Sequence, residues 1–363
     1  MKHLFAIFIP LCIICYIGFG VSLAVLGTKE VNVATDTASV VTDGTQIEVA
    51  DNIESYEINK PFDRIDIDTA FYDVTIIQSV DADKVSIVVE RPDDASFTND
   101  FTAKVSGNTL SLTSSKIWGK GLEQFWKNLA HSIASGDFSD TFSAARVTVT
   151  IPEKLYKSLD IGLGSGSLTV TELTANDIDI EMGSGALRYY GRDGFTADRL
   201  TFSMGSGKAE TYSLGAREYD IDIGSGAFDL NGLCGTGEFD MGSGSGTLGF
   251  AEYSGDGDFA IGSGSLTIAL PRDANADLDA SLGSGKLVIN ACGVDRTIKD
   301  SGNITFGEGG AALDITVGSG RVNVQNLDVG KTVITSGDSI ITTTFSENYV
   351  EEIAEIEDIA EIA

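Results

Sequence analysis

The sequence predicts an all-β fold: a single-stranded parallel β-helix, or β-solenoid, with coils of about 19 residues. Three observations predict it. A Gly-Ser-Gly tripeptide recurs through the second half of the chain, apolar residues alternate on both sides of each copy, and the repeat is too short for a helix between its two strands. We expect right-handed coils, although the pattern itself does not give the handedness.

The tripeptide begins at eight positions: Gly164, Gly183, Gly205, Gly224, Gly242, Gly262, Gly283 and Gly318. Two degenerate copies, Asp300-Ser301-Gly302 and Thr335-Ser336-Gly337, complete the series. Successive starts lie 17 to 22 residues apart and average 19. A period in this range is typical of stacked coils, in which like residues stack on like. The glycines suit a corner that needs either a positive φ or a close backbone approach.

Alternation around each copy predicts which side chains are buried. One residue before the first glycine stand Leu163, Met182, Met204, Ile223, Met241, Ile261, Leu282 and Val317. Three residues before it stand Ile161, Ile180, Phe202, Ile221, Phe239, Phe259, Ala280 and Ile315. Four residues after it stand Leu168, Leu187, Ala209, Phe228, Leu266, Leu287 and Val322. These three columns predict the core.

Acidic residues form another column, four residues before the first glycine: Asp160, Asp179, Asp220, Glu238, Asp258, Asp279 and Asp314, interrupted by Thr201. Asp222 and Asp240 join it two positions further on. These residues alternate with the core columns, so we expect them to face solvent. Neighbouring carboxylates about 4.8 Å apart repel by roughly 0.9 kcal/mol even in water. Bound Ca²⁺, raised pKa values, or solvent and salt could offset this repulsion. The sequence therefore leaves metal binding undecided.

The N-terminus begins with an apolar run of 24 residues, Leu4 to Gly27. As a helix it would extend about 36 Å, enough for the ~30 Å hydrocarbon core of a bilayer. We expect residues 1–27 to be an uncleaved transmembrane anchor, with a signal segment cleaved near Ser22-Leu23-Ala24 as the alternative. Residues 28–61 are predicted to be a tether and lead-in, and residues 62–345 the β-helix domain.

Two further segments depart from the repeat. Residues 116–140 carry both tryptophans, Trp118 and Trp126, at helical spacing in the chain's basic stretch. They predict a helical insertion, either a lid over the solenoid or an interfacial helix that contacts the membrane or a partner. Residues 346–363 contain seven acidic residues and no basic one. They predict an acidic tail or cap, with a partner-docking helix as the alternative.

Composition excludes several kinds of chemistry. A formal net charge of −30 makes nucleic acid a poor partner. The two histidines, His3 and His131, lie outside the repeats, which disfavours a Ser-His-Asp triad or a histidine-rich metal site. Cys234 and Cys292 are predicted to lie about three coils apart and to stay unbridged. We expect that the protein is not an enzyme and that it binds no cofactor.

A carbohydrate-binding or polysaccharide-cleaving β-helix is the alternative, because such enzymes use clustered carboxylates with basic side chains. The candidate cluster is formed by Arg188, Arg192, Asp193, Asp198 and Arg199. It lies in the longest repeat, so a loop insertion explains it equally well. Four aromatic residues that could line a glycan groove are Tyr189, Tyr190, Tyr212 and Tyr253.

The strand ending in Ile-Pro, Val147 to Pro152, and the phrase Leu159 to Gly166 carry a family resemblance. From about Phe62 to Phe345 the chain resembles the bacterial adhesin-like β-strand-repeat proteins, a cell-envelope family of unknown function. The resemblance implies a β-helix outside the membrane and no catalytic residues.

Together these observations predict a non-enzymatic, single-pass protein of the bacterial cell membrane with its β-helix on the extracytoplasmic side. It would act as an adhesin or as a scaffold for protein interaction or stress sensing. The expected partners are other envelope or membrane proteins, or surface glycans.

Overall fold

The computed structural model describes residues 40–41, 45–50, 53–69, 72–90, 99–116, 146–327, 330–336 and 339–345, and its regular elements there are all β-strands. The predicted transmembrane segment 1–27 and acidic tail 346–363 lie outside these residues, as does the helical insertion 116–140 apart from Lys116. Among the described residues, none belongs to a helix long and apolar enough to span a bilayer.

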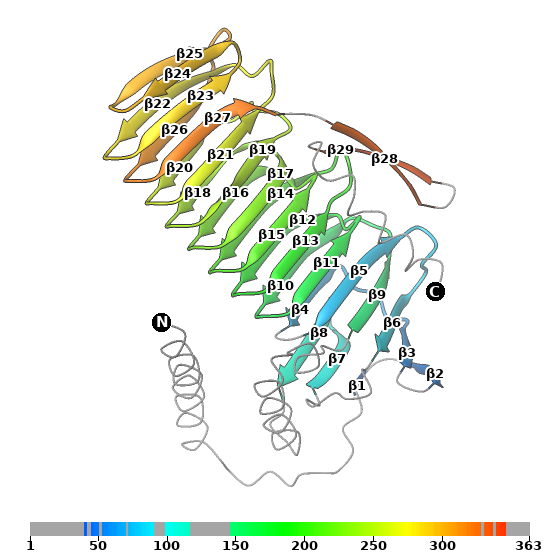
Figure 1. The fold of residues 1–363 in the computed structure, drawn as a ribbon. Helices are drawn as coiled ribbons and strands as arrows, with labels where there is room; N and C mark the ends of the chain where they lie inside the picture. Colours follow the sequence, from blue (N-terminus) through cyan, green and yellow to red (C-terminus); the bar gives the residue numbers. More distant parts are fainter. Residues whose placement is uncertain are drawn as a thin grey trace, which may run out of the picture. The chain divides into compact units, whose positions relative to one another are not determined.

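The described strands form two long sheets and one short one (Figure 1). Sheet A has thirteen strands, in the order β1 (Val40–Val41), β7 (Asn99–Ser106), β8 (Thr109–Lys116), β4 (Arg64–Thr69), β10 (Tyr156–Leu163), β12 (Ala175–Met182), β14 (Thr196–Met204), β16 (Gly215–Ile223), β18 (Thr236–Met241), β20 (Gly257–Ile261), β26 (Ala311–Val317), β22 (Ala276–Leu282) and β25 (Gly302–Phe306).

Sheet B has fourteen strands, in the order β2 (Thr45–Ala50), β3 (Ile53–Ile58), β6 (Val85–Glu90), β9 (Arg146–Pro152), β5 (Asp73–Ser79), β11 (Ser167–Thr171), β13 (Ala186–Tyr190), β15 (Lys208–Tyr212), β17 (Ala227–Leu233), β19 (Ser245–Phe250), β21 (Ser265–Leu270), β27 (Arg321–Asn326), β23 (Lys286–Ala291) and β24 (Val294–Ile298). The short sheet pairs β28 (Gly330–Ser336) with β29 (Ser339–Phe345).

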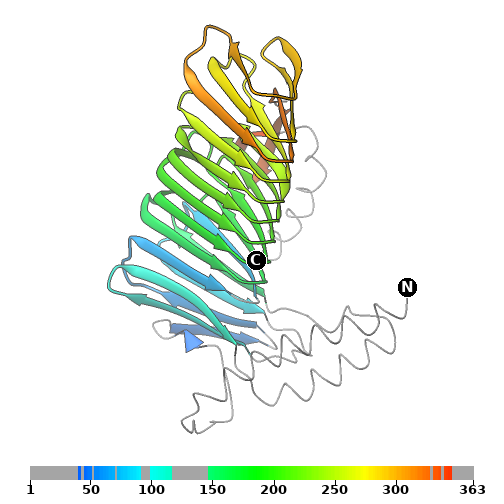
Figure 2. The ribbon, with the colours of Figure 1, turned by 90° about the vertical axis from the view of Figure 1, so that its left-hand side faces the viewer.

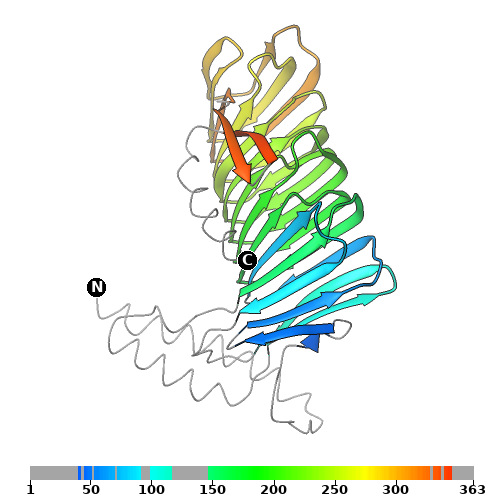
Figure 3. The ribbon, with the colours of Figure 1, turned by 90° about the vertical axis from the view of Figure 1, so that its right-hand side faces the viewer.

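Each Gly-Ser-Gly copy is the corner of one coil. The chain runs along a strand of sheet A, turns at the tripeptide and returns along a strand of sheet B (Figure 2 and Figure 3). Neighbouring coils pair in parallel, with equivalent residues opposite each other, as in Leu163 opposite Met182 and Leu168 opposite Leu187. The predicted parallel β-solenoid is confirmed, whereas its right-handedness stays a prediction.

The corners require close approach rather than a positive φ. A Cβ on Gly207, the third residue of its corner, would lie 2.4 Å from the carbonyl oxygen of Gly185 in the neighbouring corner. Among the described glycines, the positive φ angles fall outside the tripeptides, for example at Gly232 and Gly235. The tripeptide is therefore selected because a side chain at its third position would meet the backbone of the next coil.

The core is one continuous cluster between the two sheets. The predicted apolar columns are buried throughout, apart from Leu282, which is only partly buried. Gly246 occupies the last column without a side chain, and a Cβ there would lie 2.1 Å from the carbonyl oxygen of Phe228 and 2.6 Å from its ring.

The coils are not stacked in sequence order at the C-terminal end. The coil β26–β27 lies between β20–β21 and the earlier coil β22–β23. The order of the tripeptides in the sequence is therefore not the order of the coils in space. Both coils carry apolar residues at the same repeat positions, so β26–β27 can pack against β20–β21 as well as β22–β23 could.

The two degenerate copies do not form coils either. Asp300-Ser301-Gly302 connects β24 to β25, which pair antiparallel with β23 and β22 and cover the edges of the last coil. Thr335 and Ser336 belong to the antiparallel pair β28–β29. Antiparallel strands at the end of a solenoid pair with the backbone N–H and C=O groups that are exposed at the edge of the parallel stack. A further parallel coil would leave an equivalent unpaired edge one coil further out.

The N-terminal end repeats this arrangement. Coil β8–β9 lies outside the earlier coil β4–β5, which in turn pairs with β10–β11. These strands belong to the same solenoid, as predicted for the chain from residue 62 onward, and antiparallel strands β3, β6 and β7 extend it. Part of the segment predicted as a tether forms strands β1 to β3. Residues 117–145, which separate β8 from β9 in the sequence, lie outside the described residues.

Candidate interaction surface

The predicted acidic residues lie in one row across the outer face of sheet A. In spatial order this first acidic column is Asp66, Asp160, Asp179, Thr201, Asp220, Glu238, Asp258, Asp314 and Asp279. The row is confirmed with two changes: Asp66 extends it, and Asp314 lies between Asp258 and Asp279. Asp66 and Thr201 are half-buried and the others are exposed. The row is therefore a continuous solvent-facing line of carboxylates broken at one strand.

A second acidic column runs two residues nearer the corners. Its members are Asp68, Gly162, Glu181, Ser203, Asp222, Asp240, Ala260, Thr316 and Ser281. Small residues separate several of its carboxylates. The second column therefore has lower charge density and more open space than the first.

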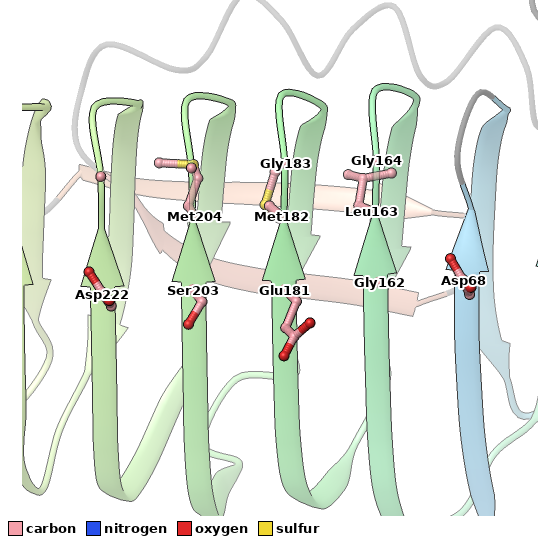
Figure 4. A pocket seen from close by; sticks show the side chains of 12 residues that line it. Asp68, Gly162, Leu163, Gly164, Glu181, Met182, Gly183, Ser203, Met204 and Asp222 are labelled. Carbon is pink, nitrogen blue, oxygen red and sulfur yellow. The ribbon is translucent and has the colours of Figure 1, made fainter. Parts of the chain in front are cut away.

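That open space forms a hollow of about 610 Å³ between β4 and β16. Asp68, Glu181, Ser203 and Asp222 stand on successive strands around it, with Gly162 between the first two (Figure 4). A Cβ at Gly162 would come 3.6 Å from Oδ1 of Asp68, so the missing side chain keeps the hollow open. No three His, Cys, Asp or Glu side chains of the described residues are grouped so that they could hold a metal ion.

Two carboxylates of the first acidic column hold protons more strongly than usual. Burial raises the pKa of Asp160, and the charges of Asp179 and Asp66 raise it further, although Ser158 donates a hydrogen bond to Oδ2 at 3.3 Å. Burial also raises the pKa of Asp179, and Glu181 adds to the effect. Raised pKa values are thus present at these strands, with burial as their largest cause; repulsion within the first acidic column adds to the shift at Asp160.

The structure does not bring the candidate catalytic cluster together. Arg188 pairs with Glu210 on sheet B at 3.4 Å, and Arg199 pairs with Glu218 on sheet A at 3.5 Å. Arg192 bridges two other carboxylates. Each arginine is therefore used in a separate ion pair between coils, and the loop interpretation of this long repeat is the better one.

The acidic members of that cluster are likewise engaged elsewhere. Asp193 accepts a hydrogen bond from Ser213 at 2.6 Å, and Asp198 pairs with Arg217 at 2.5 Å. Arg192 contacts Glu153 and, at 3.1 Å from Nε, Glu172. These contacts tie neighbouring coils together rather than converging on one point.

The four candidate aromatic residues do not form an exposed groove. Tyr189, Tyr212 and Tyr253 are only 1%, 7% and 6% exposed. The rings of Tyr189 and Tyr253 belong to the core, and their hydroxyls donate to the carbonyls of Leu173 and Ala312 at 2.9 and 2.7 Å. Tyr190 is half-buried and stacks on Tyr212 with ring centroids 5.1 Å apart. The expectation of exposed aromatics is therefore wrong for three of the four.

Cys234 and Cys292 are both free and half-buried. Their sulfur atoms lie 3.4 Å from the carbonyl oxygens of Ala216 and Pro271. Burial raises the pKa of both thiols. They therefore remain protonated and are poor nucleophiles.

A basic hollow of about 500 Å³, which was not predicted from the sequence, lies beside the C-terminal corners. Lys286, Lys299 and Arg321 line it, together with serines of three corners. A signal was available, since Lys286 and Arg321 both stand three residues after the first glycine of their repeat. Their adjacency could not be read from the sequence, because it depends on the degenerate copy Asp300-Ser301-Gly302 forming no coil between them.

The parallel sheets, antiparallel end strands and exposed charged columns define an end-capped β-solenoid with a repetitive surface. The chain belongs to the Toastrack DUF4097 family, whose profile matches residues 62–325. The family resemblance predicted from the sequence is thereby confirmed, and the matched domain is one of unknown function.

Several solved structures are similar to this chain. One is a proposed lipid-binding protein from Parabacteroides distasonis, with 18% identity, a TM-score of 0.44 and coverage of 75% of this chain and 96% of that one. Another is a proposed adhesin from Bacteroides fragilis, with 15% identity, a TM-score of 0.39 and coverage of 76% and 98%. No curated protein matches the chain.

Proposed function

We propose that this protein is a non-enzymatic adhesin of the bacterial cell envelope that binds basic partner surfaces through sheet A. The observation that supports this most is the first acidic column, which is continuous from β4 to β22 except at Thr201. The regular spacing of its carboxylates suits a partner with Lys or Arg side chains displayed along an extended surface.

Such a surface binds by repetition. A single exposed ion pair contributes only about 0–1 kcal/mol. Several such pairs formed at once by one partner raise the overall affinity without any strong single contact. The proposed binding is therefore multivalent and sensitive to salt, as expected for exposed charges.

Membrane attachment is part of the proposal. The apolar run from Leu4 to Gly27 is long enough to cross a bilayer and would hold the solenoid on the extracytoplasmic side as a single-pass protein. The partners would then be other envelope proteins or the surface of a neighbouring cell. A non-enzymatic role is supported by the separate ion pairs that engage Arg188, Arg192 and Arg199.

The test uses the full chain in lipid nanodiscs and an immobilised basic polypeptide, poly-lysine. The column variant carries Asp220→Asn, Glu238→Gln, Asp258→Asn and Asp279→Asn. The matched control carries Asp81→Asn, Asp83→Asn, Asp273→Asn and Asp295→Asn, four exposed acids outside the column. We expect the column variant to bind about tenfold more weakly and the control to stay within about twofold of the natural chain. Equal losses in both variants would show that only net charge matters and would contradict the proposal.

A further inference from the structure

Three basic side chains lie in a row at the C-terminal end of sheet B. Arg321 begins β27 and is opposite Lys286, which begins β23. Lys299 directly follows β24, whose last residue Ile298 is opposite Leu287 of β23. Lys299 therefore lies beside Lys286, and the row crosses three neighbouring strands.

This row is unusual in a chain with a net charge of −30. Like charges placed opposite each other on neighbouring strands are destabilising. Arg321 donates from Nε to Asn323 at 3.0 Å, but none of the three forms an ion pair with a described residue. By contrast, Lys208 and Arg217 on inner coils each contact a carboxylate.

The row lines the hollow of about 500 Å³, together with Ser263, Ser319 and Ser284 from three successive corners. The backbone amides of Ser319 and Ser284 already donate to Gly262 and Gly318 of the neighbouring corners, both at 2.8 Å. The serines therefore offer the hollow their hydroxyls, one from each coil. The volume lies within the range of small-ligand sites, about 300–1,000 Å³.

We propose that this basic hollow binds a segment of an acidic glycan. The planar guanidinium of Arg321 can donate two parallel hydrogen bonds to a carboxylate, and the ammonium groups of Lys286 and Lys299 can pair with further negative charges. The serine hydroxyls can form hydrogen bonds with the hydroxyls of a sugar. One exposed carboxylate, Asp300, directly follows Lys299. Three cations in one row can each pair with a carboxylate at the same time, so a polymer that presents several carboxylates is the ligand that the row favours over a single small anion.

These residues are distinct from the first acidic column, so failure of either proposal leaves the other standing. The probe is a short oligogalacturonate, titrated onto the full chain in nanodiscs, with a neutral maltooligosaccharide and inorganic phosphate in parallel. The site variant is Lys286→Gln, Lys299→Gln, Arg321→Gln. The matched control is Lys84→Gln, Lys157→Gln, Arg217→Gln, which removes three cations that form ion pairs elsewhere. Thermal unfolding of both variants verifies that they remain folded.

We expect saturable binding of the oligogalacturonate that weakens with salt, falls about tenfold in the site variant and stays within about twofold in the control. The proposal is overturned if the natural chain does not bind the oligogalacturonate, or if both variants lose binding equally. It is also overturned if the neutral sugar binds as well, or if phosphate competes at equal concentration, which would indicate a site for small oxyanions.

Discussion

The third glycine of each corner packs against the carbonyl oxygen of the corresponding glycine in the neighbouring coil. The distance from an added Cβ to that oxygen would be 2.6 Å at Gly185, 2.4 Å at Gly207 and 2.6 Å at Gly226. The first glycine is less restricted in two corners, with 3.0 Å at Gly183 and 3.2 Å at Gly205, whereas the distance is 2.6 Å at Gly262 and Gly283. In the corners that begin at Gly183 and Gly205, the two glycines therefore tolerate a side chain to different degrees.

Gly207→Ala and Gly205→Ala test this difference in a single corner. We expect Gly207→Ala to lower the free energy of unfolding by about 2–3 kcal/mol, because the methyl group must push two coils apart. Gly205→Ala should cost about 1 kcal/mol or less, since its contact is looser and alanine restricts the unfolded chain. Denaturant unfolding measures both, and equal losses would argue against close approach as the reason for the third glycine.

The raised pKa values of Asp160 and Asp179 give a second prediction at this scale. A carboxyl whose pKa is higher in the folded state favours folding at low pH, and this contribution is lost as the pH rises through the folded pKa. At pH 7 both charges therefore destabilise the fold. Asp160→Asn with Asp179→Asn should raise the free energy of unfolding by about 0.5–1 kcal/mol at low salt.

The gain should disappear below the ordinary pKa of 3.8, where both natural carboxyls are protonated in either state. Denaturant unfolding at neutral and acidic pH measures it, with Asp81→Asn and Asp83→Asn as the charge-matched control. A gain of the same size at both pH values would mean that lost repulsion is not its cause.

At the scale of the coil, the repeat determines what stacks but not in which order. The apolar and acidic columns could be predicted because each repeat position has one environment in every coil. The position of β26–β27 inside β22–β23 could not, since Ala280 and Ile315 both fit the same core column. The antiparallel end strands were missed for a related reason: alternation is the same in parallel and antiparallel strands.

The coil order can be tested with pairs of cysteines at exposed or half-buried positions of sheet A. Ala260 is opposite Thr316, and Thr316 is opposite Ser281. Oxidation should therefore give an intramolecular disulfide with Ala260→Cys and Thr316→Cys, and none with Ala260→Cys and Ser281→Cys. Peptide mass spectrometry identifies the bridge. Stacking in sequence order would give the reverse result, while the pair at 281 and 316 should bridge in either case.

Across the whole described domain, the acidic and basic side chains gather in different places. Sheet A carries the acidic columns, and the basic hollow lies beside the corners at the C-terminal end. The acidic surface could be predicted because its residues recur at one position of the repeat. The basic hollow could not, because Lys299 directly follows an antiparallel end strand, and Arg321 lies beside Lys286 only because the copy at Asp300-Ser301-Gly302 forms no coil between them.

The most direct test of the central claim is adhesion by cells that carry the full chain in their envelope. Cells with the natural chain, the column variant and its charge-matched control are allowed to settle on a layer coated with basic polypeptide and are washed with buffers of increasing salt. We predict that the natural chain and the control retain cells up to a similar salt concentration, while the column variant loses them at low salt. Retention of the column variant equal to that of the natural chain would contradict the claim that sheet A is the adhesive surface.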